Sequence, residues 1–190
     1  MIGRAYPEMQ VRAKLGLAPL AALVFAVYVL GQHGVIALPT GPSTRPAAPS
    51  RAARAEIPPG YLALYRASAR SCPGLPWGVL AGIGEVESDH GRSRAPGVRV
   101  GVNRFGCCAG PMQFNVRNGP PSTWDAYGDG VAAHVYQARY AVPATVRLLC
   151  RNGARGGRDV RGAVYAYNHA GWYVDQVLAL ARRYQAGGER

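Results

Sequence analysis

The sequence predicts an all-α domain that begins near Ile57, and three observations support this fold class. Apolar residues after Ile57 recur at intervals of three and four, which is the period of an amphipathic helix. Prolines, glycines and capping residues stand where such helices would begin and end. The sequence has no internal repeat and no convincing alternation of apolar and polar residues. One long irregular segment is expected between Gly91 and Gly130.

An apolar segment near the amino end predicts that the chain leaves the cytoplasm. Residues 15–38 contain no Asp, Glu, Lys or Arg and follow a basic cytoplasmic start at residues 1–14. Their length lies between that of a signal-peptide core and that of a membrane span. A cleaved signal peptide and an uncleaved signal anchor both stay open. We therefore expect an extracytoplasmic protein, either secreted or bound to the membrane through this segment.

A proline-rich stretch separates the apolar segment from the folded domain. Residues 39–56 hold four prolines and no large hydrophobic side chain. Such a composition cannot build a core, so we predict an extended linker. The folded domain is then residues 57–190.

The expected helices follow from apolar spacing and from capping residues. In chain order, they are residues 58–71, started by Pro58 or Pro59; residues 75–90; a short turn capped by Ser122; residues 143–153, opened by Pro143 and closed by Asn152 and Gly153; residues 159–168, capped by Asp159; and residues 172–184.

Four cysteines follow the apolar segment, and oxidation is the default outside the cytoplasm. We pair Cys72 with Cys150, since each lies at the end of a predicted helix and their bond would close a long loop. A bond between Cys107 and Cys108 joins Cα atoms about 3.8 Å apart, closer than ordinary disulfides tolerate. A crossed pairing through one of these two therefore stays open. The sequence has no Cys-x-x-Cys, so we predict no metal site and no cofactor.

The net charge of +12 raises the question of an anionic partner. Of the 22 basic residues only Lys14 is a lysine, and the arginines are scattered singly and in pairs. A nucleic-acid surface would need them clustered with aromatic residues or in a known binding module. We expect no nucleic-acid partner.

Two glutamates in the stretch "GEVESDHG" differ in their position on the predicted helix. At 100° per residue Glu87 lies about 20° from Leu80, whereas Glu85 lies about 140° away. A carboxyl group on the apolar side is desolvated, which raises its pKa. Glu87 is therefore a candidate general acid, and its alternative is a structural glutamate at the helix end. His90, one turn on, either caps the helix or lines the same cleft.

Three short motifs in fixed order resemble the SLT-domain lytic transglycosylases, in particular their actinobacterial branch. They are the "ES" of Glu87 and Ser88, the loop "GPMQF" with Met112 and Gln113, and "AYN" with Tyr167 and Asn168. The resemblance covers roughly residues 57–185.

The resemblance implies a lysozyme-like helical domain that cuts the β-1,4 bond between N-acetylmuramic acid and N-acetylglucosamine in peptidoglycan glycan strands. Glu87 matches the catalytic glutamate, which first donates a proton and then removes one as a 1,6-anhydro ring closes. Met112, Gln113 and Asn168 match substrate-binding positions. Tyr167 matches the tyrosine whose hydroxyl reaches the catalytic carboxyl, and it also counts among the substrate-binding positions. Ser88 matches the motif serine, which is grouped with the substrate-binding positions and has a structural role as its alternative. Tyr173 is a further candidate for the cleft.

A one-carboxylate reaction agrees with the scarcity of acids in this chain. Glycosidases that use an enzyme nucleophile or an activated water need a second carboxylate near the first. Only Asp125 and Asp129 are plausible for that role. A muramidase that adds water is the first alternative, and a non-catalytic module that binds the cell wall is the second.

Overall fold

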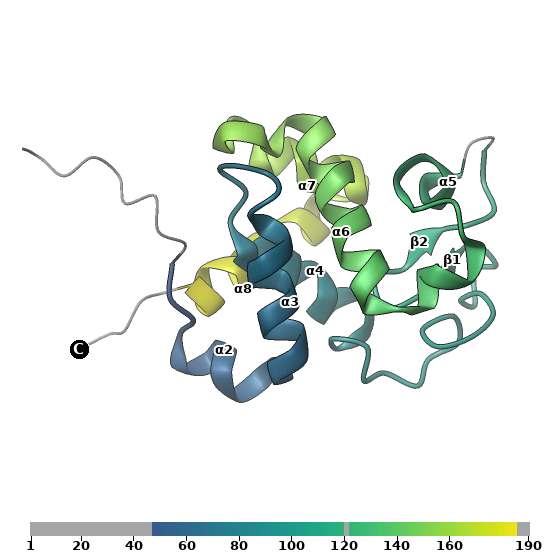
Figure 1. Ribbon diagram of the computed structural model, residues 1–190, viewed down its shortest axis with the longest axis horizontal. Helices are drawn as coiled ribbons and strands as arrows, with labels where there is room; N and C mark the ends of the chain where they lie inside the picture. Colours follow the sequence, from purple (N-terminus) through teal and green to yellow (C-terminus); the bar gives the residue numbers. More distant parts are fainter. Residues whose placement is uncertain (1–46, 120–121, 186–190) are drawn as a thin grey trace, which may run out of the picture. The chain divides into compact units, whose positions relative to one another are not determined.

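Helices make up most of the structure, which confirms the all-α prediction. The structure is a computed structural model, and it describes residues 47–119 and 122–185. The elements, labelled as in Figure 1, are α2 (Arg51–Glu56), α3 (Pro59–Ala69), α4 (Trp77–Ser88), β1 (Cys108–Ala109), β2 (Phe114–Asn115), α5 (Thr123–Tyr127), η1 (Ala132–Tyr136), α6 (Ala138–Leu149), η2 (Cys150–Ala154), η3 (Arg155–Gly157), α7 (Val160–Tyr167) and α8 (Gly171–Gln185).

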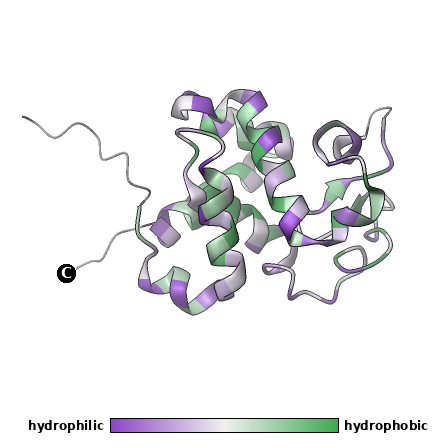
Figure 2. Cartoon of the chain, viewed as in Figure 1, coloured by the Kyte–Doolittle hydropathy of each residue, from purple (hydrophilic) through white to green (hydrophobic). Residues whose placement is uncertain are grey.

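Helix α4 forms the centre of the fold. Every residue from Trp77 to Gly84 is buried, and the first charged side chain of the helix is Glu85. A helix that is apolar on all sides must be covered on all sides, and α3, α6 and α8 pack against it. Hydrophobic segments gather on these inner helices in Figure 2, while hydrophilic segments lie on outer turns. The end of α4 is therefore the first place where its side chains can reach a surface.

Two glycines let α8 approach α4 closely. A Cβ atom at Gly82 would lie 2.6 Å from the carbonyl oxygen of Val177, and one at Gly78 would lie 2.7 Å from that of Ala181. Both distances are shorter than a van der Waals contact, so no side chain fits at either position. This approach fixes α8 against the helix that carries Glu87.

We predict that Gly82→Ala destabilises the domain, while Gly60→Ala stabilises it. Alanine gains roughly 1 kcal/mol over glycine in a helix, but overpacking against Val177 costs about 1 to 3 kcal/mol. At Gly60 in α3, an added methyl group would meet no atom within 4 Å outside its chain neighbours and its own helix backbone, so only the stabilising effect applies. Urea denaturation of the two variants should give shifts of opposite sign. A stabilised Gly82→Ala variant would contradict the close approach of α8.

The Cys72–Cys150 disulfide is present, as predicted. Its Cα atoms are 5.8 Å apart, and it joins the turn after α3 to the end of α6 across 78 residues. Cys107 is bonded to Cys108, which decides the pairing that the sequence left open. All four cysteines are thereby oxidised.

The predicted linker is wrong in its second half. Residues 51–56 form α2 instead of an extended chain, and Ser50 caps the helix by accepting a hydrogen bond from the backbone of Ala53. Ala53 and Ile57 are buried, and the indole of Trp77 donates to the carbonyl of Ala47. The prolines end at Pro49, and the alanine- and arginine-rich residues that follow favour a helix. The folded part of the chain therefore begins by residue 47.

Helix α6 begins before Pro143, which was expected to open it. The helix starts at Ala138, so Pro143 lies inside it. Ala141 and Val142 are fully buried with the residues that follow the proline. Burial of this turn offsets the backbone hydrogen bond that proline cannot donate.

The irregular segment after Gly91 contains a hairpin that the sequence did not reveal and a short helix where a turn capped by Ser122 was expected. Two-residue strands β1 and β2 pair in an antiparallel hairpin, with Ala109 opposite Phe114. Helix α5 follows, with Ser122 and Asp125 in a reciprocal capping box. Figure 1 shows these elements gathered at one end of the fold, beyond α6. Asp159 caps α7 as predicted, by accepting from the backbone of Gly162.

The predicted apolar segment 15–38 and the first part of the linker, residues 39–46, lie outside the described residues. Within the described ranges, no helix is both long and apolar enough to cross a bilayer.

Candidate active site

A cavity of about 490 Å³ opens where the end of α4 meets the β1–β2 hairpin and the end of α7. We call it the Glu87 cleft. Its lining combines one acid with amides, one imidazole and a few apolar groups. The lining residues are Glu87, Asn103, Phe105, Cys107, Cys108, Gln113, Phe114, Asn115, Thr123, Leu148, Ala166, Tyr167, Asn168 and His169.

Burial raises the pKa of Glu87 to about 7. The side chain is partly accessible through the cleft but is otherwise surrounded by protein, so its charged form is poorly solvated. The hydroxyl of Tyr173 donates a hydrogen bond to Oε1 over 2.6 Å, which opposes part of that rise. No arginine pairs with Glu87 among the described residues. Near neutral pH a large share of the carboxyl groups is protonated, with Oε2 left to carry the proton.

We predict that Tyr173→Phe raises the pKa of Glu87 above 7. The substitution removes the donor that stabilises the carboxylate and leaves the burial in place. A ¹³C NMR titration of the side-chain carboxyl measures this directly. Tyr165→Phe is the matched control, because Tyr165 is exposed and does not line the cleft. An unchanged or lowered pKa in Tyr173→Phe would contradict the hydrogen bond.

The other glutamate of the pair, Glu85, faces away from the cleft. Its Oε2 lies 3.0 Å from Nε2 of His90, although the two groups are not aligned for a hydrogen bond. The imidazole of His90 is buried, and its Nδ1 lies 3.1 Å from the hydroxyl of Tyr65. The backbone of His90 closes α4 by donating to the carbonyl of Gly84. His90 therefore ends the helix and does not line the cleft.

The loop before β2 presents Gln113 to the cleft. Gly110 adopts a left-handed conformation with φ of +81°, and a Cβ atom there would overlap the carbonyl oxygen of Val135. The Gly110 carbonyl accepts from both the backbone and the side-chain amide of Gln113. The Asn103 amide donates to Oε1 of Gln113 over 3.2 Å. These contacts hold Gln113 at φ of +46°, which is uncommon for a residue with a side chain.

Tyr167 and Asn168 line the cleft, but the Tyr167 hydroxyl does not reach Glu87. Its hydroxyl donates instead to the backbone carbonyl of Met112 over 2.5 Å. The hydroxyl that reaches Glu87 belongs to Tyr173, in the first turn of α8. The sequence placed this role on Tyr167 because that residue lies in the motif, whereas the packing of α8 on α4 decides which hydroxyl is closer.

Ser88 and Met112 support the loop and do not line the cleft. The Ser88 hydroxyl donates to the carbonyl of Pro111 over 2.6 Å and accepts from the backbone of Gly91. The Met112 side chain is fully buried in the core. Their expected contact with substrate is thus corrected to a positioning role.

Neither candidate for a second carboxylate lines the Glu87 cleft. Asp125 caps α5 through Ser122, and Asp129 lies 2.6 Å from Nδ1 of His134. Glu87 is the one acid among the described residues that line this cavity. Among all residues that the structure describes, no group of three or more His, Cys, Asp or Glu could hold a metal ion.

Sequence reasoning missed several cleft residues that come from the irregular segment. Asn103, Phe105 and Asn115 carry no motif, and only the fold of the hairpin brings them beside Glu87. The adjacent cysteines are an unusual feature of the sequence, but the sequence does not show that they line the cleft.

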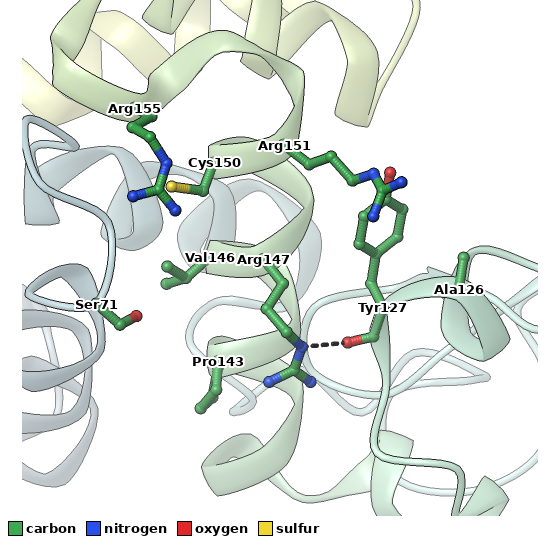
Figure 3. A pocket seen from close by; sticks show the side chains of 9 residues that line it. All are labelled: Ser71, Ala126, Tyr127, Pro143, Val146, Arg147, Cys150, Arg151 and Arg155. Carbon is green, nitrogen blue, oxygen red and sulfur yellow. Dashed lines mark hydrogen bonds between the residues drawn. The ribbon is translucent and has the colours of Figure 1, made fainter.

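A second cavity, of about 700 Å³, lies along the outer side of α6 (Figure 3). Arg147, Arg151 and Arg155 line it, and the Nε of Arg147 donates to the carbonyl of Tyr127 over 2.7 Å. Its described lining contains no acid and no histidine, so it lacks a group that could exchange a proton near neutral pH. The Glu87 cleft is the better candidate for chemistry.

Comparison of the chain with protein-family models, with curated proteins and with solved structures finds no match.

Proposed function

We propose that the chain is a peptidoglycan lytic transglycosylase that uses Glu87 as its single catalytic carboxyl. One observation carries the proposal: a carboxyl group with a pKa of about 7 lies in an open cleft whose other polar lining is mostly amides. A general acid works best when its pKa lies near the working pH. The order of the three sequence motifs supplies the substrate class.

In the proposed reaction, Glu87 first acts as the acid. Its proton passes to the glycosidic oxygen, the bond from that oxygen to C1 of N-acetylmuramic acid breaks, and the N-acetylglucosamine end leaves as an alcohol. The acetamido carbonyl of the same sugar shields the positive charge at C1. Tyr173 keeps a hydrogen bond to Oε1 throughout and stabilises the carboxylate that forms.

In the second half, Glu87 acts as the base. The carboxylate removes the proton from the 6-hydroxyl of the same N-acetylmuramic acid, and that oxygen attacks C1. The ring closes as a 1,6-anhydro sugar, and the carboxyl is protonated again. Substrate assistance of this kind needs no second enzyme carboxylate. This agrees with the place of Asp125 and Asp129 outside the cleft.

The proposed substrate places the domain outside the cytoplasm. Two disulfides are typical of an oxidising compartment. The apolar segment 15–38 would then deliver the domain to the cell surface, as a signal peptide or as an anchor.

Product masses test the proposal. Purified full-length protein is incubated with isolated peptidoglycan sacculi, and the released fragments are analysed by mass spectrometry. Anhydro ends, lighter than reducing ends by one water, are the expected product. Reducing ends would instead identify a muramidase, and binding without release would identify a non-catalytic wall-binding module.

A further inference from the structure

The disulfide between Cys107 and Cys108 lies in the Glu87 cleft. Adjacent side chains of an extended strand normally point to opposite faces. A bond between the two sulfur atoms prevents this and keeps both on one side. Both cysteines line the cleft together with Glu87. The bond therefore turns the start of β1 into an apolar, polarisable surface that faces the cleft.

Backbone hydrogen bonds fix this surface in place. Cys108 pairs with Asn115 across the hairpin, and the carbonyl of Cys107 accepts from the backbone of Val116 over 2.9 Å. The carbonyl of Cys108 accepts from the backbone of Asn103 over 2.8 Å. The disulfide is thus held by the same hairpin that presents Gln113.

Phe105 extends the apolar surface toward solvent. Its side chain is 73 % exposed, yet it lines the same cleft. The Oδ1 atom of Asn103 accepts hydrogen bonds from the backbone amides of both Phe105 and Cys107. One side chain therefore holds the backbone of the phenyl ring and of the disulfide. The Arg104 guanidinium lies 4.8 Å from the centre of the phenyl ring. A single exposed phenyl ring is ordinary, but this ring lines the same cleft as the disulfide, and apolar surface gathered in a groove can bind a ligand.

We propose that Phe105 and the Cys107–Cys108 disulfide form a saccharide-binding subsite of the Glu87 cleft. A pyranose ring has an apolar C–H face and a polar rim. The C–H face would pack on the sulfur atoms and the phenyl ring. The hydroxyl and acetamido groups would meet the amides of Asn115 and Asn168, which line the same cleft. This subsite rests on the proposed function, because a glycan strand is its ligand.

Affinity for a defined sugar chain tests the subsite. The probe is a hexamer of β-1,4-linked N-acetylglucosamine, and calorimetry measures its binding to full-length Glu87→Gln protein, in which turnover is blocked. Adding Phe105→Ala, or Cys107→Ser with Cys108→Ser, should weaken binding about fivefold to tenfold. Val100→Ala is the control, since Val100 is 77 % exposed and does not line the cleft. It should leave the affinity within about twofold of the parent.

Affinities that stay within about twofold in the test variants would overturn the subsite, and so would a parent that does not bind the hexamer. Thermal denaturation checks that the serine variant folds. If it does not, Phe105→Ala decides alone, because an exposed side chain contributes little to the core. Product masses from sacculi are read separately. Anhydro products with unchanged affinities would reject only the subsite, whereas weakened affinities without products would reject only the reaction.

Discussion

Glu87→Gln should lower the release of anhydro fragments from sacculi about a thousandfold while leaving glycan binding intact. General acid–base catalysis by one positioned group contributes roughly 10² to 10⁴ in rate, and here the same group acts in both halves of the reaction. Glutamine keeps the shape of the side chain and an oxygen that can accept from Tyr173. It has no acidic proton to donate. Initial rates of fragment release and a parallel sedimentation assay with sacculi measure the two quantities.

Glu85→Gln is the matched control for this result. Glu85 lies two residues earlier on α4, and burial also raises its pKa, but it faces His90 and does not line the cleft. The rate of fragment release by the Glu85→Gln variant should stay within about threefold of the wild-type rate. Equal losses in both variants would indicate damage to α4 in place of lost acid catalysis, and a fully active Glu87→Gln would end the proposed mechanism.

Local signals in the sequence predicted the elements that local chemistry decides. The apolar run of α4 and the capping residues Ser122 and Asp159 depend on patterns that a short window contains. Glu87 was identified for the same reason, because its position relative to Leu80 is a property of one helix.

Long-range packing decided what the sequence did not predict. The composition of α2 favours a helix, but the helix packs on the domain because Ala53 and Ile57 are buried there, which no local pattern predicts. Tyr173 reaches Glu87 because Gly78 and Gly82 let α8 approach α4. The choice between two hydroxyls thus depends on glycines that lie outside every motif.

Long-range contacts also decide which residues of the irregular segment line the cleft. Asn103 lies ten residues before Gln113, and only the hairpin brings their amides to 3.2 Å. The bond between Cys107 and Cys108 was disfavoured by the short spacing of adjacent Cα atoms. The structure accommodates it with the Cα atoms 3.7 Å apart.

The raised pKa of Glu87 also has a cost in stability. A carboxyl group whose pKa rises from 4.5 to about 7 on folding binds its proton more tightly in the folded state. Above pH 7 the group is charged in both states, and the folded state bears the poor solvation. Below pH 4.5 it is protonated in both states, and the penalty is absent. Glu87 therefore destabilises the wild type at high pH and not at low pH.

Glu87→Gln should consequently make the domain more stable by about 3 kcal/mol at pH 8, since each pKa unit corresponds to about 1.4 kcal/mol. The gain should shrink as the pH falls through 7 and vanish near pH 4.5. Urea denaturation of both proteins from pH 8 to pH 4.5 measures the difference.

His90 has the opposite effect on the pH dependence of stability, and it has this effect in both proteins. Burial lowers its pKa to about 4, so the free energy of unfolding falls as the pH drops below 6.5. Taking the difference between the variant and the wild type cancels that contribution and leaves the titration of Glu87. Asp175→Asn is the control for a lost negative charge, since among the described residues Asp175 forms only an exposed pair with Arg161. A Glu87→Gln variant that is no more stable than the wild type at pH 8 would show that the carboxyl is well solvated, and a well-solvated carboxyl would be ionised and unable to act as the acid at neutral pH.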